Sequence, residues 1–185
     1  MLSTNQFKTG MALLVDGELC LILEFQHVKP GKGAAFVRTK LQSVKTGSIV
    51  NRTFDAGEKF QEAFIEKRDI QFQYRAGDTY HFMDTETYEE RVIRAEELGD
   101  SVHYLLENME VRGEFYEGRF IGLELPTSVV LTVKESEPGL KGDTSKGSMK
   151  PAILETGYKI QVPLFISAGE KVKVDTRTGE YTGRA

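Results

Sequence analysis

Turn signals interrupt the chain at short intervals, and the segments between them are rich in branched and aromatic residues. In the first third, the turn signals Asp16-Gly17, Pro30-Gly31 and Thr46-Gly47 separate segments at 11–15, 18–27, 34–44 and 48–54. Such segments predict β-strands joined by tight turns. Eighteen glycines and five prolines, scattered without a repeat, also indicate many turns and short strands.

The rest of the chain continues this pattern with almost no helix. Residues 70–84 predict two strands around an Ala76-Gly77-Asp78 turn, and residues 87–100 predict a short strand and one short helix ending near Gly99. More strand-like segments follow at 102–125, 128–136, 158–166 and 170–184. Closing a barrel removes exposed strand edges, so we predict three small β-barrels, over residues 1–64, 65–128 and 129–185.

The charge of the chain is unevenly distributed, although its net value is only −4. Residues 65–128 carry 7 basic and 15 acidic side chains, whereas the segments before and after them are each net +2. Between Phe25 and Phe54 there is no acidic residue but six basic ones: Lys29, Lys32, Arg38, Lys40, Lys45 and Arg52. This acid-free strip could bind a polyanion despite the overall sign, with a plain solvated face as the alternative.

Residues 36–41 alternate cleanly, as expected for a strand with one buried face. If Val37 and Leu41 face a core, Arg38 and Lys40 face outward. The single cysteine, Cys20, lies in the apolar run LCLIL and is predicted to be a buried thiol in a reducing compartment. The first residues show no signal-peptide pattern, and the run MALLV near the start is too short to span a bilayer, so we expect a soluble, cytoplasmic protein that does not bind membranes.

Lys32 is unusual because Gly31 and Gly33 flank it at an expected hairpin tip. A phosphate-binding P-loop would need Ser or Thr after Gly-Lys and then a helix, but here a strand follows. A Schiff-base lysine needs a pocket that desolvates it, which a tip cannot supply. Two readings stay open: a cation presented on a backbone that can approach another surface closely, and an ordinary exposed turn lysine.

The chain is predicted to be a binding protein and not an enzyme. His27, His81 and His103 lie far apart and, with one cysteine, lack metal-ligand spacing, so no metal and no cofactor are expected. The acidic pairs Glu89-Glu90 and Glu96-Glu97 fall in the acidic segment and are predicted to be solvated. No local grouping suggests a Ser-His-Asp triad.

Two distant motifs carry a family resemblance. Residues 29–38, KPGKGAAFVR, resemble the first-domain loop of bacterial elongation factor P. Residues 150–169, which begin KPAILETG and continue through IQVP to Ile166 and Gly169, resemble the C-terminal signature of the same family. The segment GDTSKG at 142–147 is also in the place that the resemblance implies. The resemblance covers the full length of the chain.

The resemblance implies an SH3-like barrel followed by two OB-fold barrels, in an L-shaped arrangement similar to tRNA. It also implies a monomeric translation elongation factor that binds the ribosome, with its rRNA and ribosomal proteins, beside the P-site peptidyl-tRNA. Such a factor stimulates peptide-bond formation at consecutive prolines. Lys32 would reach toward the peptidyl-transferase centre from the tip loop of Pro30, Gly31 and Gly33. It would act either bare or extended by a modifying enzyme.

The remaining expected contacts are with RNA. Lys29, Arg38, Lys40 and Lys45 are predicted to contact phosphates beside the tip. The resemblance places Gly142, Asp143 and Thr144 near the E-site codon, and Tyr181 and Arg184 near a tRNA anticodon stem.

A general single-stranded RNA-binding protein built on OB folds is the second hypothesis. It would need exposed stacking rings, for which the candidates are Phe72, Tyr74, Tyr80 and Phe82 in the acidic segment. That acidic setting counts against it, and a small-molecule enzyme ranks third.

Overall fold

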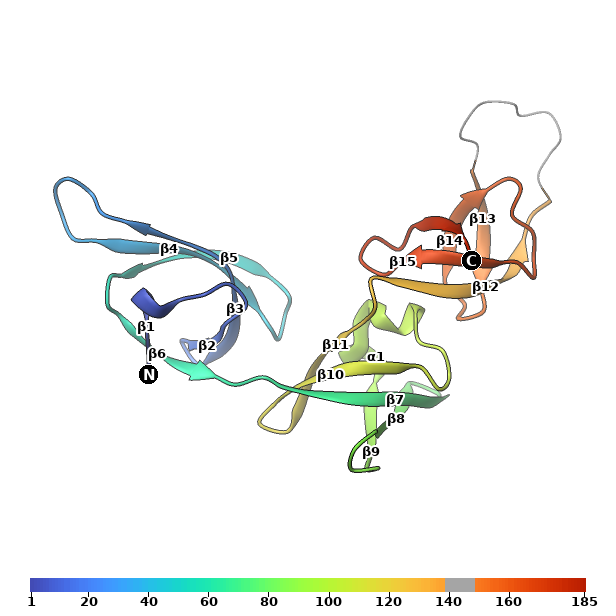
Figure 1. The fold of residues 1–185 in the computed structure, drawn as a ribbon, viewed down its shortest axis with the longest axis horizontal. Helices are drawn as coiled ribbons and strands as arrows, with labels where there is room; N and C mark the ends of the chain where they lie inside the picture. Colours follow the sequence, from blue (N-terminus) through green and yellow to red (C-terminus); the bar gives the residue numbers. More distant parts are fainter. Residues whose placement is uncertain (139–148) are drawn as a thin grey trace. The chain divides into compact units, whose positions relative to one another are not determined.

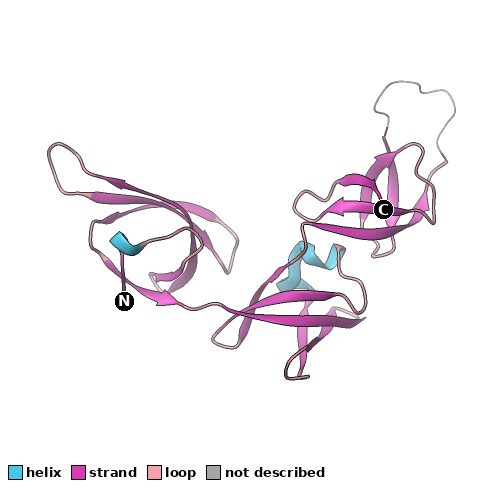
Figure 2. Cartoon of the chain, in the orientation of Figure 1, coloured by secondary structure: helices cyan, strands magenta, loops and turns pink. Residues whose placement is uncertain are grey.

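The computed structural model describes residues 1–138 and 149–185, and almost all of its regular structure is β-strand (Figure 2). The prediction of an all-β chain is therefore confirmed. The one α-helix, among the described residues, is α1 at Ala95–Leu98, and it ends at Gly99 as predicted. Two short 3-10 helices, η1 at Thr4–Gln6 and η2 at Gly99–His103, were not predicted.

The N-terminal sheet has the strand order β1-β6-β2-β3-β4-β5 (Figure 1). Its strands are β1 Leu2–Ser3, β2 Ala12–Val15, β3 Glu18–Val28, β4 Phe36–Ser43, β5 Ile49–Asp55 and β6 Lys59–Ala63. Alternate side chains along these strands meet in one core, where Leu13, Ile22, Val37 and Leu41 are completely buried. Cys20 is buried beside them, as its apolar surroundings predicted.

The middle sheet has the order β11-β10-β7-β8-β9. Its strands are β7 Glu66–Ala76, β8 Thr79–Asp84, β9 Glu90–Arg94, β10 Glu110–Tyr116 and β11 Arg119–Glu124. The predicted hairpin around Gly77 joins β7 to β8, and Gly77 has φ +61°, a conformation that glycine adopts at little cost. Ile70 and Phe82 are completely buried under this sheet.

The C-terminal sheet has the order β14-β13-β12-β15-β16. Its strands are β12 Ser128–Ser136, β13 Met149–Leu154, β14 Lys159–Pro163, β15 Lys171–Asp175 and β16 Tyr181–Arg184. Its core gathers completely buried side chains such as Leu131, Leu154 and Val172, and it also takes in Tyr104, which follows η2.

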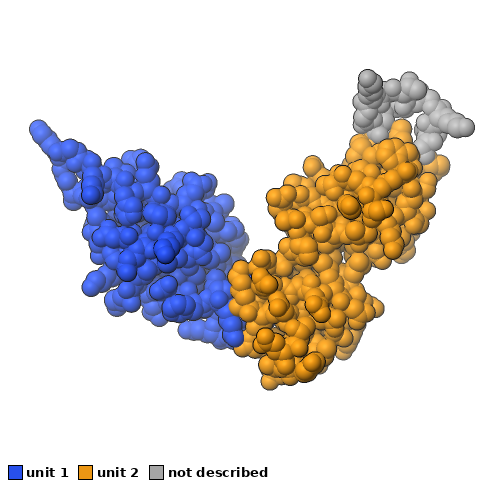
Figure 3. Space-filling view, viewed as in Figure 1, with its two compact units in different colours: residues 1–66, 114–121 blue, residues 67–113, 122–185 orange. Residues whose placement is uncertain are grey.

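The chain forms two compact units, coloured blue and orange in Figure 3. Unit 1 comprises residues 1–66 and 114–121, and unit 2 comprises residues 67–113 and 122–185. The three-domain division at residues 64 and 128 stays a prediction, as does the arrangement of domains that the resemblance implies. Within the described ranges, no helix has the length and apolar character needed to cross a membrane.

Candidate RNA-binding tip and surfaces

The loop that carries Lys32 lies at the end of a long hairpin. Strands β3 and β4 remain paired as far as Val28 and Phe36, and residues 29–35 join them. In the described part of the chain, β2 pairs with β3 only from Glu18 to Leu21, so the outer half of β3 has β4 on one side alone. The hairpin end therefore projects from unit 1 (Figures 1 and 3).

Lys32 is fully available at this tip. Its side chain is exposed, and no described residue forms an ion pair or hydrogen bond with it. Gly33 has φ +110°, which L side chains rarely adopt, so the backbone itself requires glycine there. Gly31 lies outside the positive-φ region, and a Cβ added to it would meet no atom within 4 Å. Pro30 and Lys29 are also exposed.

Strand β4 presents its basic side chains outward, as its alternation predicted. Val37 and Leu41 are completely buried, whereas Arg38 is exposed. The guanidinium carbon of Arg38 lies 5.5 Å from the centre of the Phe36 ring, within the range of a cation–π interaction. Arg38 therefore offers an ordered positive charge close to the tip.

In the structure, two acidic side chains from other parts of the sequence pair with basic residues of the acid-free strip. The Lys40 ammonium lies 3.5 Å from a carboxylate oxygen of Glu24, the residue opposite it on β3. Arg52 similarly donates a hydrogen bond of 3.1 Å to Asp16, in the turn between β2 and β3. Both acids lie outside the strip in sequence. Lys29, Lys32 and Arg38 have no ion-pair partner among the described residues, so they carry most of the uncompensated charge.

Lys45 does not lie beside the tip, and this part of the expectation was wrong. It is exposed in the turn between β4 and β5, at the opposite end of β4 from Lys32. A strand of this length spans about 23 Å at the usual rise per residue. Lys45 can therefore contact only a separate phosphate from those near Lys32.

In the C-terminal sheet, Arg184 is held from two directions. Its guanidinium carbon lies 4.7 Å above the Phe165 ring, and one of its nitrogens lies 3.2 Å from a carboxylate oxygen of Glu170. Tyr181 is partly buried against the core of this sheet. Gly142, Asp143 and Thr144 lie outside the described residues.

Three family models match the chain in order. They are the elongation factor P KOW-like domain over residues 3–60, the elongation factor P OB domain over residues 65–123, and the elongation factor P C-terminal domain over residues 129–184. Proteins named elongation factor P from Moorella thermoacetica and Acidothermus cellulolyticus are 55% and 57% identical to it over 185 residues. Those alignments cover the whole of this chain and 100% and 99% of the relatives. The chain belongs to the elongation factor P family. It is therefore a translation elongation factor.

Solved structures agree on the fold. The structure of eukaryotic translation initiation factor 5A from Methanococcus jannaschii aligns with a TM-score of 0.55 at 23% identity, over 64% of this chain and 88% of that one. A translation initiation factor eif-5a family protein from Naegleria fowleri aligns with a TM-score of 0.54 at 15% identity, over 67% of this chain and 94% of that one. At these identities the likeness concerns the fold alone.

The middle sheet of this elongation factor P family member offers few rings for stacking on bases. Phe72, Tyr80 and Phe82 are buried in its core. Tyr74 is exposed, but its ring already stacks on His81 with 4.3 Å between ring centres. The aromatic face that general single-stranded RNA binding would need is therefore mostly inside the protein.

Sequence reasoning missed the two partners of Arg184. Phe165 and Ile166 are adjacent apolar residues, and only the structure shows that Ile166 is completely buried while Phe165 is 60% exposed. Glu170 also accepts a hydrogen bond from the backbone N–H of Ser167, which fixes its carboxylate near Arg184. The apolar run around Phe165 gave no signal for this arrangement, because such a run is typical of a segment that is buried throughout.

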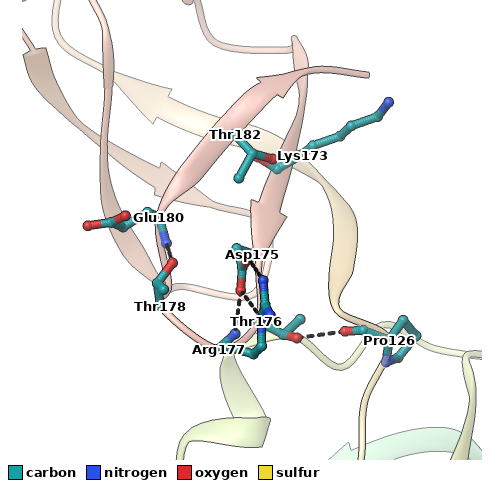
Figure 4. Close-up of polar contacts among 8 residues, drawn as sticks. All are labelled: Pro126, Lys173, Asp175, Thr176, Arg177, Thr178, Glu180 and Thr182. Carbon is teal, nitrogen blue, oxygen red and sulfur yellow. Dashed lines mark hydrogen bonds and ion pairs between the residues drawn. The ribbon is translucent and has the colours of Figure 1, made fainter.

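The turn between β15 and β16 is fixed by its own polar contacts (Figure 4). Both carboxylate oxygens of Asp175 accept hydrogen bonds from the Arg177 guanidinium, at 3.1 and 2.6 Å. These bonds, with a further one from the Arg177 backbone, lower the pKa of Asp175 to about 2. The Thr176 hydroxyl donates to the carbonyl of Pro126 at 2.6 Å and ties the turn to the chain segment that enters β12. Arg177 therefore helps to hold the turn through its pairing with Asp175.

Proposed function

We propose that this translation factor binds the ribosome beside the P-site peptidyl-tRNA and stimulates peptide-bond formation, relieving stalling at consecutive prolines. One observation supports this most directly: Lys32 is an ammonium without a partner among the described residues, at the end of a projecting hairpin in a chain of the elongation factor P family. A cation that nothing in the described chain uses is available for a partner outside it.

The chemistry assigned to the factor is positioning. Proline is a poor nucleophile in peptide transfer, and it also constrains the nascent chain. A factor that holds the CCA end of the P-site tRNA in reactive geometry lowers the barrier without making or breaking a bond itself. Ideal cases of such positioning gain roughly 7–11 kcal/mol, of which a stalled ribosome would need only a part. Lys32 supplies the tip charge, and the ribosome keeps the reaction.

The surrounding cations would attach the tip to RNA. Lys29 and Arg38 are placed to contact phosphates next to Lys32, and Lys40 could join them once its pairing with Glu24 is exchanged for a phosphate. Lys45 would contact a phosphate farther along the strand. Such contacts read backbone shape and charge and not sequence.

In the C-terminal segment, Tyr181 and Arg184 stay our candidates for a tRNA contact. Lys32, whose amine is exposed, would act either bare or extended by a modifying enzyme. We propose residues 1–64, 65–128 and 129–185 as the three domains, acting as a monomer in the cytoplasm.

The test is translation of a reporter with three consecutive prolines, without the protein, with the wild-type protein and with Lys32→Ala. We expect the wild-type protein to raise read-through and Lys32→Ala to lose most of that gain. The variant should unfold at the wild-type temperature, because Lys32 is exposed and no described residue forms an ion pair or hydrogen bond with it. Equal read-through under all three conditions would refute the proposal. Intact-mass measurement of native protein then shows whether Lys32 works bare or extended.

A general single-stranded RNA-binding role is not favoured. Most of the rings it would use are buried, and the three family matches together span nearly the whole chain.

A further inference from the structure

His27 lies on β3, five residues before Lys32, and its side chain is exposed. Its partner across the hairpin is Val37 on β4, which is completely buried, and Val37 in turn lies opposite the buried Phe54 on β5. Residues directly opposite each other in antiparallel strands point to the same face of the sheet. His27 therefore continues a row of core-facing side chains into the projecting part of the hairpin, where its ring meets solvent.

Phe25 connects this ring to the body of the protein. Phe25 packs against the N-terminal core, and its ring centre lies 5.6 Å from that of His27, with the two planes at 82°. An edge-to-face contact of this kind favours one orientation of the rings without covering both faces of each. In the described chain, no hydrogen bond or ion pair engages the ring nitrogens of His27. The imidazole is thus an ordered, flat and open surface.

The charged residues that adjoin His27 in the sequence are basic. No acidic residue occurs from Phe25 to Arg38, and Lys29 and Lys32 are exposed without an ion-pair partner among the described residues. An exposed ring beside uncompensated cations is the combination with which proteins bind unpaired nucleotides, because the ring stacks on a base while the cations attract phosphates. An acidic protein segment would use the cations but would leave the ring without a role.

We infer that His27 is an RNA-binding residue whose ring stacks on an unpaired nucleobase beside the Lys32 tip. The inference rests on the proposed function, within which that RNA is the single-stranded 3′ end of the P-site tRNA. Stacking is tolerant of base identity, so His27 contributes affinity and orientation and not sequence preference.

The test measures the affinity of the full chain for ribosomes that carry a P-site peptidyl-tRNA. His27→Ala is expected to weaken binding roughly 5- to 150-fold, the loss that corresponds to one base–aromatic stack. His27→Phe keeps a flat ring and should restore most of the affinity, whereas His27→Leu keeps bulk without a flat ring and should not. His81→Ala is the matched control, because His81 is also a strand histidine with a ring contact but lies in the acidic segment.

Unchanged binding by His27→Ala would overturn the inference. An equal loss in His27→Phe would also overturn it, because it would show that the ring nitrogens act and not the flat face. Thermal unfolding of each His27 variant at the wild-type temperature shows that the fold is intact, as expected for an exposed side chain. The proposed function is decided separately, by the wild-type protein on the proline reporter, so the two ideas can fail independently.

Discussion

Replacing Gly179 by alanine should destabilise unit 2 through a specific steric conflict. Gly179 lies in the turn between β15 and β16 with φ +73°. A Cβ added there would lie 2.5 Å from the hydroxyl oxygen of Tyr158 and 3.2 Å from that of Tyr104. Tyr158 cannot easily move away, because its ring stacks on His103 with 4.2 Å between ring centres. Tyr104 is only 4% exposed, and burial is the main cause that raises its pKa to about 12.

The magnitude follows from two separate costs. An L-residue in the left-handed region costs about 1–2 kcal/mol relative to glycine. Forcing an extra methyl group into a packed cluster typically costs about 1–3 kcal/mol. The free energy of unfolding should therefore fall by about 2–5 kcal/mol in Gly179→Ala. Gly169 isolates the first cost, because it has φ +89° but no atom within 4 Å of an added Cβ.

Urea unfolding followed by circular dichroism measures both variants. The free energy of unfolding should fall only by the backbone cost in Gly169→Ala, and it should fall by more in Gly179→Ala. Tyr158→Phe removes the nearest oxygen, so Gly179→Ala made in the Tyr158→Phe background should cost less than in the wild type, with a coupling energy of about 1 kcal/mol or more. Equal losses in the two glycine variants, or no coupling with Tyr158, would refute the steric argument.

Two further predictions concern charge. Arg38→Ala should reduce the slope of log affinity for the ribosome against log salt by about one, since one phosphate contact is lost. Lys40→Ala should reduce this slope less, because Lys40 is already paired with Glu24. Equal reductions of the slope in the two variants would contradict this account. Hydrogen bonds from Arg177 are the main cause that lowers the pKa of Asp175 to about 2. The ionised carboxylate therefore stabilises the fold at pH values above the pKa near 4 that it has in the unfolded chain. This stabilisation is lost as the pH falls toward 2. Urea unfolding of wild type and Asp175→Asn should therefore differ most at neutral pH and converge between pH 4 and pH 2; a constant difference would contradict this.

Local chemistry made the strands predictable from the sequence. Val37 and Leu41 alternate with Arg38, and the structure buries the first two and exposes the third, because strand side chains point to opposite faces in turn. The short helix at Ala95–Leu98 ends at Gly99, where φ is +54°. These features depend on neighbouring residues, so a single sequence carries enough information.

Features that depend on strand pairing were harder to predict. Glu24 lies opposite Lys40 only because a register shift in β3, between Ile22 and Glu24, sets that pairing. Lys45 is near Lys40 in sequence, but the strand carries it away from the tip. Phe72 looked like a candidate stacking ring, yet the sheet turns it into the core. In each case the deciding fact is which residue a strand places opposite or beneath another.

Gly31 and Gly33 look alike in the sequence but differ in the structure, and the difference bears on function. The positive φ of Gly33 makes glycine necessary for the turn itself. At Gly31 the free chain shows no steric reason for glycine, since an added Cβ would meet open space. Alanine at a position with compatible backbone usually stabilises a protein by about 0.4–1 kcal/mol, by restricting the unfolded chain. Glycine at Gly31 is consistent with the proposed function, in which a surface outside the chain comes close to the backbone beside Lys32.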